Sequence, residues 1–274
     1  MKKKTVKRVC MVMMTGMMLA GCGKSTDKPA EQEAPVEAQV EESADEAESK
    51  EVSDGAGAAS TETTSESDFE LGRVGDVTGI VKYTGNAENV VIPDTIDGVT
   101  ITAIGNAFSN NETIKSVEIP DTVEVIGKNA FFQCDSLEAV KMSSNVKVID
   151  EAAFCMCSNL KDITFPEGLE SIGELAFSET GLEEIELPSS LKKLDFGVFS
   201  TLSIKTVTLP EGMEYIGASC FGECNQLEKV YIPESVTEID GDIFYDCGDV
   251  TIVTTAGSYA ETYANENGIP CEIQ

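Results

Sequence analysis

The chain of 274 residues contains no histidine and no tryptophan, and aromatic residues make up only 6% of it. Without imidazole, Ser-His-Asp triads, Cys-His dyads and every histidine-ligated metal site are excluded. Basic residues are also scarce, because 19 Lys and Arg stand against 49 Asp and Glu and leave a formal charge of −30. A chain this acidic is not expected to bind nucleic acid.

The first residues have the pattern of an export signal. Residues 2–8 carry five basic side chains and no acid, and residues 9–21 are dominated by Met, Val and Leu. This apolar stretch is too short to span a membrane, so we predict a signal peptide over residues 1–21 that is removed. The junction Leu-Ala-Gly-Cys at 19–22 resembles the lipobox of bacterial lipoproteins, which implies a lipid on Cys22 and anchoring at the extracellular face of the cell membrane. The alternative is an ordinary secretory signal followed by a chance cysteine.

The next segment is acidic and poor in apolar residues. Residues 22–68 hold 14 acids, three Lys, two Pro and no aromatic residue. Such a composition cannot bury enough apolar surface to offset the entropy of ordering, so we predict a disordered linker over residues 22–70. An acidic run of this kind could instead bind calcium or a basic partner, but a solvated spacer is the simpler interpretation.

The sequence repeats from residue 90 onward with a spacing of 22 or 23 residues after a first, longer unit. Each unit approximates V-x-I-P-x-x-V-x-x-I-G-x-x-A-F-x-x-C-x-x-L. The V-x-I segment predicts a short strand that the Pro ends, and the Gly or Asp after the second Ile predicts a turn. One phenylalanine recurs per unit, as expected if stacked coils bury one ring against the next. These residues are Phe108, Phe131, Phe154, Phe177, Phe199, Phe221 and Phe244.

This unit resembles the repeat of the BspA-like leucine-rich repeat proteins. The resemblance implies a β-rich solenoid of about seven repeats with one row of parallel strands. It also implies an N-terminal hairpin, for which residues 77–93 are suited, and a C-terminal helical cap at residues 258–268. We therefore expect the repeat domain with its N-terminal cap at 71–253 and the C-terminal cap at 254–274.

Cysteine is the richest chemical signal, but the repeat explains most of it. Four of the seven cysteines after Cys22 occupy the same slot, three residues after the phenylalanine: Cys134, Cys157, Cys224 and Cys247. The simplest interpretation is a buried small side chain, although neighbours in the slot would also lie close enough for a disulfide. A cysteine-only zinc site would have to join units almost three repeats apart. A solenoid without long insertions gives paired carboxylates no cleft. We therefore expect no catalytic residue, no metal site and no cofactor, and hence no enzyme.

The outward positions of the strand row are the candidate binding surface. They are Glu118, Lys141, Thr164, Glu186, Thr208 and Tyr231. A flanking column of mixed charge runs beside them: Lys115, Glu138, Lys161, Glu183, Lys205 and Glu228.

The anchor, the spacer and the repeat domain indicate a surface lipoprotein, expected to be a monomer, that binds a protein ligand, and the resemblance implies adhesion to host or neighbouring-cell proteins. The acidic charge favours a partner with a basic patch and binding that weakens as salt rises. Two alternatives stay open: an envelope lipoprotein that captures carbohydrate or peptide, and a purely structural spacer.

Overall fold

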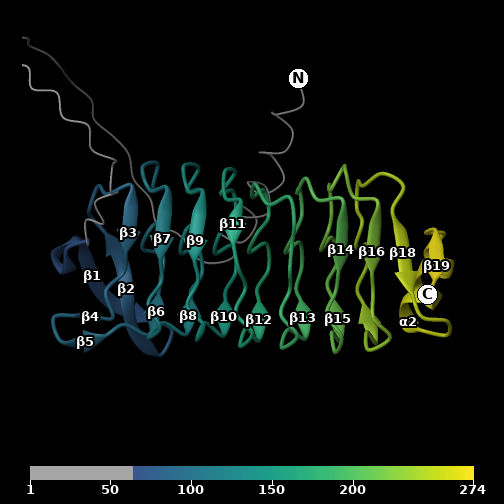
Figure 1. Ribbon diagram of the computed structural model, residues 1–274, viewed down its shortest axis with the longest axis horizontal. Helices are drawn as coiled ribbons and strands as arrows, with labels where there is room; N and C mark the ends of the chain where they lie inside the picture. Colours follow the sequence, from purple (N-terminus) through teal and green to yellow (C-terminus); the bar gives the residue numbers. More distant parts are fainter. Residues whose placement is uncertain (1–63) are drawn as a thin grey trace, which may run out of the picture. The chain divides into compact units, whose positions relative to one another are not determined.

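Repeated coils of the chain stack on one another in the computed structural model, which describes residues 64–274 (Figure 1). The predicted signal peptide, Cys22 and the predicted linker up to residue 63 lie outside the described residues. Within residues 64–274 the architecture is the predicted parallel-strand solenoid. Its one α-helix within these residues is short and lies near the C-terminal end.

The V-x-I segments form the predicted row of parallel strands, but the row is divided into two sheets. The first sheet contains β3 (Asn89–Val91), β7 (Ser116–Glu118), β9 (Ala139–Lys141) and β11 (Asp162–Ile163). The second contains β14 (Thr206–Thr208), β16 (Lys229–Tyr231), β18 (Thr251–Thr254) and β19 (Cys271–Ile273). Between them, the unit at Ile185 contributes only one isolated parallel bridge, Glu186 to Thr208.

A second row of strands, which the sequence did not predict, lies opposite the first (Figure 1). It consists of two-residue strands at the V-x-x-I segments, which come directly before the turns that we predicted. They are β6 (Ala103–Ile104), β8 (Val125–Ile126), β10 (Val148–Ile149), β12 (Ser171–Ile172), β13 (Lys193–Leu194), β15 (Tyr215–Ile216) and β17 (Glu238–Ile239). With the N-terminal hairpin they make a continuous nine-stranded sheet.

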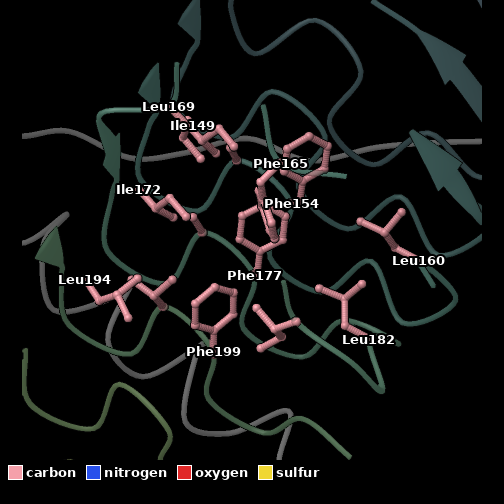
Figure 2. Close-up of a cluster of buried hydrophobic side chains, with 14 of the residues drawn as sticks. Ile149, Phe154, Leu160, Phe165, Leu169, Ile172, Phe177, Leu182, Leu194 and Phe199 are labelled. Atoms are coloured by element: carbon pink, nitrogen blue, oxygen red, sulfur yellow. The ribbon is translucent and has the colours of Figure 1, made fainter. Parts of the chain in front are cut away.

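The phenylalanines stack in a column between these rows, as predicted. Phe108 and Phe131 have ring centroids 4.8 Å apart and nearly parallel planes, and Phe131 and Phe154 follow at 5.0 Å. Figure 2 shows Phe154, Phe177 and Phe199 with Ile149, Ile172 and Leu194 on one side and Leu160 and Leu182 on the other. Phe154 and Phe177 therefore pack between the second strand row and a leucine of the returning loop.

The turn that carries each phenylalanine forms a third ladder of hydrogen bonds between units. The Phe131 amide donates to the Ala153 carbonyl at 2.7 Å, and the Phe154 amide donates to the Ala176 carbonyl at 2.8 Å. These turns place non-glycine residues at positive φ, such as Gln133 at 56° and Met156 at 65°. The hydrogen bonds between units offset the cost of this backbone conformation.

The N-terminal end is closed by a hairpin, but the hairpin predicted over residues 77–93 is wrong, because residues 77–83 pair with residues 69–74 and residues 89–91 join the first sheet instead. The observed hairpin consists of β1 (Phe69–Val74) and β2 (Val77–Tyr83), preceded by the short 3-10 helix η1 (Glu66–Asp68). The boundary that we predicted for the linker, residue 70, is thus too late, because Phe69 is buried and its ring lies 5.3 Å from that of Tyr83. Tyr83 in turn lies 5.2 Å from Phe108 and so begins the ring column.

An extra hairpin accounts for the longer first unit. It is formed by β4 (Thr95–Ile96) and β5 (Val99–Thr100), with Asp97 and Gly98 at positive φ in the turn between them. Two consecutive left-handed residues are typical of a two-residue hairpin turn.

The C-terminal end is closed by the predicted helix, α2 (Tyr259–Asn267). The Ser258 hydroxyl accepts from the Glu261 amide, and Gly268 ends the helix at φ 68°. Tyr263 fixes the helix to the last unit, since its hydroxyl donates to the Gly241 carbonyl at 3.0 Å.

Candidate binding face

The six residues that the sequence singled out lie along one side of the solenoid. Glu118 and Lys141 are paired in register on β7 and β9, and Thr208 and Tyr231 are paired on β14 and β16. Thr164 directly follows β11, and Glu186 is bridged to Thr208. Their side chains are exposed or half-buried, whereas the alternating residues, such as Val140 and Val207, are buried. We call these six residues the strand-row face.

Charges on and beside this face are paired between successive units. Lys141 forms an ion pair with Glu118, and Lys115 and Glu88 lie 2.7 Å apart. The hydrogen bond to Glu88 raises the pKa of Lys115. Likewise, the hydrogen bond from Lys161 lowers the pKa of Glu183. Much of the acidic charge on the N-terminal part of the face is therefore neutralised internally.

Two hollows open on the strand-row face. The first, the N-terminal hollow, has a volume of about 500 Å³ and is lined by residues of β3, β7 and β9 together with Asp162 and Thr164. The second, the central groove, has a volume of about 990 Å³ and is lined by residues 183–187, Ser203, Lys205, Thr206, Thr208, Pro210 and Gln226. Five of the six residues of the strand-row face line one hollow or the other, and Tyr231 lines neither.

The central groove lies where the strand row is interrupted, and the sequence shows why. Phe154 precedes the next strand residue, Ile163, by nine positions, but Phe177 precedes Ile185 by only eight and Phe199 precedes Val207 by eight. The returning loop is one residue shorter in these two units. The ring spacing widens at the same point, from 5.2 Å between Phe154 and Phe177 to 5.8 Å between Phe177 and Phe199.

The sequence analysis missed several residues of the central groove. Ser203, Thr206, Leu187 and Gln226 line it but were not among the predicted contact residues. The signal that could have located the groove was the spacing of 22 instead of 23 residues, which marks the shortened loops.

The cysteines of the repeat slot serve the packing of the units, as expected for buried small side chains. The Cys134 thiol donates to the Phe108 carbonyl at 3.0 Å, and the Cys157 thiol donates to the Phe131 carbonyl at 3.0 Å. None of the seven cysteines of residues 64–274 forms a disulfide, so that alternative is not realised. Burial raises the pKa of Cys224 to about 12 and that of Cys247 to about 11, which keeps both thiols protonated and unreactive at neutral pH.

No group of three or more acidic or cysteine side chains within residues 64–274 could hold a metal ion. No helix in this range is long and apolar enough to cross a membrane. The lipidation predicted at Cys22 falls outside the described residues.

Comparisons with known proteins gave one negative result and several similar structures. A comparison with curated proteins finds no match. Solved structures with a similar fold include a leucine-rich repeat protein from T. pallidum, with 22% identity, a TM-score of 0.49 and 77% of this chain and 98% of that chain covered. A leucine-rich cell surface protein from Faecalibacterium prausnitzii A2-165 has 22% identity and a TM-score of 0.47, over 71% of this chain and 76% of that chain.

The family is settled by a sequence match. The model of the BspA type leucine-rich repeat region, in six copies, matches residues 80–202 and 192–266. These ranges cover more than half of the chain and include the ring column, both strand rows except β19, and most of α2. Repeats of this type are generally protein-interaction modules and are typically not enzymes. The chain belongs to the BspA-type leucine-rich repeat family.

Proposed function

We propose that this protein is a lipoprotein anchored to the cell surface through Cys22, whose solenoid binds another protein through the strand-row face. The observation that carries the binding proposal is the face itself, where outward side chains from successive units surround two hollows. Adhesion to a host or neighbouring-cell protein is the role that fits an anchor, an acidic spacer and a rigid repeat domain. The anchor rests on the sequence of residues 1–22.

The anchor is tested by metabolic labelling with a radioactive fatty acid. The full-length protein should incorporate label and remain with the membrane fraction, and the Cys22→Ser variant should do neither. Label that persists in the variant would show that Cys22 is not the acceptor.

Binding is tested with two matched substitutions. Arginine at Thr208 places a long, charged side chain on the strand-row face, whereas arginine at Thr237 places the same side chain just before β17 in the opposite row. Captured extracellular proteins should be lost with Thr208→Arg and retained with Thr237→Arg. Equal capture by both variants would place the contact elsewhere.

Carbohydrate capture finds no support in the geometry of the face. Sugar sites usually offer an aromatic platform, but no aromatic side chain lines either hollow among the described residues. The protein partner is therefore the better-supported ligand.

A further inference from the structure

We propose that the central groove binds an extended peptide segment that carries lysine or arginine side chains. This inference rests on the proposed function, because it names the part of the strand-row face that makes the contact and the chemistry of the partner. Three features support it: the interrupted strand row, the charges in the groove and the size of the groove.

The backbone that lines the central groove has fewer strand-pairing partners than the backbone of the other units. In the first sheet each inner strand is paired on both sides, as β9 is with β7 and β11. At the interruption, β11 pairs only with β9, and the pairing of residues 184–187 within the described chain is limited to the bridge from Glu186 to Thr208. Backbone polar groups that a neighbouring strand would otherwise satisfy are thus left to water or to a ligand. An extended peptide offers matching donors and acceptors.

The charges of the groove favour a cationic occupant. Its lining includes Glu183, Glu184 and Glu186 but only one base, Lys205. Lys161 already pairs with Glu183 at 2.7 Å, whereas Glu184 and Glu186 are exposed and form no ion pair with any residue of 64–274. The N-terminal hollow differs, because its Glu118 and Lys141 neutralise each other. Two carboxylates are therefore available in the central groove for a basic side chain.

The floor and the size of the groove suit a peptide. Leu187 and Pro210 contribute half-buried apolar surface, against which the stem of a lysine or arginine can pack while its charged end reaches the carboxylates. Residues 184–187 run for about 13 Å at about 3.3 Å per extended residue, so a peptide aligned with them needs about four residues.

The test measures binding of a labelled peptide to the full-length protein. The probe is fluorescein-labelled Lys-Thr-Lys-Thr-Lys-Thr, followed by anisotropy at low salt, with the Glu-Thr repeat peptide as its acidic counterpart. The double variant E184Q/E186Q should weaken binding of the basic probe about fivefold to tenfold. The matched double variant E214Q/E238Q removes the same charge from exposed positions at the opposite row and should leave binding unchanged. Lys205→Gln removes the only base and should strengthen binding about twofold.

Equal weakening in the two double variants would overturn the inference, because the probe would then respond to overall charge and not to the groove. Unchanged binding in E184Q/E186Q, or equal binding of the acidic peptide, would overturn it as well. Hydrogen exchange gives a readout without mutation: the probe should slow exchange of the amides at 184–187 and leave those of β9 unchanged. An absence of this protection would also count against the groove.

The peptide-binding test and the capture test with Thr208→Arg distinguish failure of this inference from failure of the proposed function. If the basic probe does not bind but Thr208→Arg still abolishes capture of a protein, the strand-row face binds a partner of other chemistry. If both experiments fail, the proposed function falls with the inference.

Discussion

The two halves of the solenoid share the same apolar slots but differ in how tightly their units are joined. From Phe108 to Phe177 the ring centroids lie 4.8–5.2 Å apart, whereas from Phe177 to Phe244 they lie 5.8–6.3 Å apart. Five Lys–Glu ion pairs connect units of the first half, the last of them Lys161 to Glu183. In the second half, within the described residues, the corresponding pair is Lys229 with Glu272 of the end strand.

This difference shows that the sequence specifies the packing of the core and the pairing of the strands through separate features. Every unit keeps its phenylalanine, so the column of rings continues through the interruption. The strand ladder also requires that each returning loop deliver the next strand in register. The unit after Phe177, whose loop is one residue shorter, meets the first condition and not the second, whereas the unit after Phe199 has an equally short loop and still forms β14.

The largest expected effect comes from removing rings on either side of the interruption. Phe154 and Phe221 are both fully buried, but Phe154 has neighbouring rings at 5.0 and 5.2 Å and Phe221 at 6.2 and 6.3 Å. Each alanine substitution should destabilise the protein by about 3–5 kcal/mol. Phe154→Ala should lie at the upper end, because more close contacts are lost. Urea unfolding followed by circular dichroism measures both. An equal or larger loss for Phe221→Ala would show that ring spacing does not report packing strength.

A smaller effect is expected from lengthening the short loop. Insertion of one Asn between Gly181 and Leu182 restores the nine-residue distance from Phe177 to Ile185, and should join β11 to the following unit. Amides at 184–187 should then exchange about tenfold more slowly, which corresponds to about 1.4 kcal/mol of added local stability.

The control for this insertion is an Asn between Asp135 and Ser136, where the loop already has nine residues. There the extra residue should shift the register of β9 and destabilise the protein by about 1–3 kcal/mol. If both insertions prove equally harmful, loop length is not what interrupts the strand row.

The features that repeat were predictable from sequence, and the features that depend on a single residue were not. The phenylalanine slots and the strands at Val117 and Val140 followed from the repeat pattern, and the helix after Ser258 followed from the family resemblance. The second strand row escaped prediction because strands of two residues, such as Val125–Ile126, are too short to show alternation. The central groove was not predicted because the shortened loops leave every apolar position of the repeat filled. The lipid at Cys22 stays a prediction.

The smallest expected effect concerns the ion pairs that distinguish the halves. Lys128 lies 2.6 Å from Glu151 of the next unit, whereas the exposed Lys205 forms no ion pair with any residue in the described range. Exposed pairs contribute little, so Lys128→Gln should lower the free energy of unfolding by about 0.5 kcal/mol, and Lys205→Gln should leave it unchanged. The Lys128 effect should also shrink as salt rises, because screening weakens exposed pairs. Thermal unfolding of the three proteins at low and high salt measures both claims. An equal loss of stability from the two substitutions would mean that the lysines act through the overall acidic charge of the chain and not through pairing between units. The closer packing of units in the first half would then rest on its rings and strands alone.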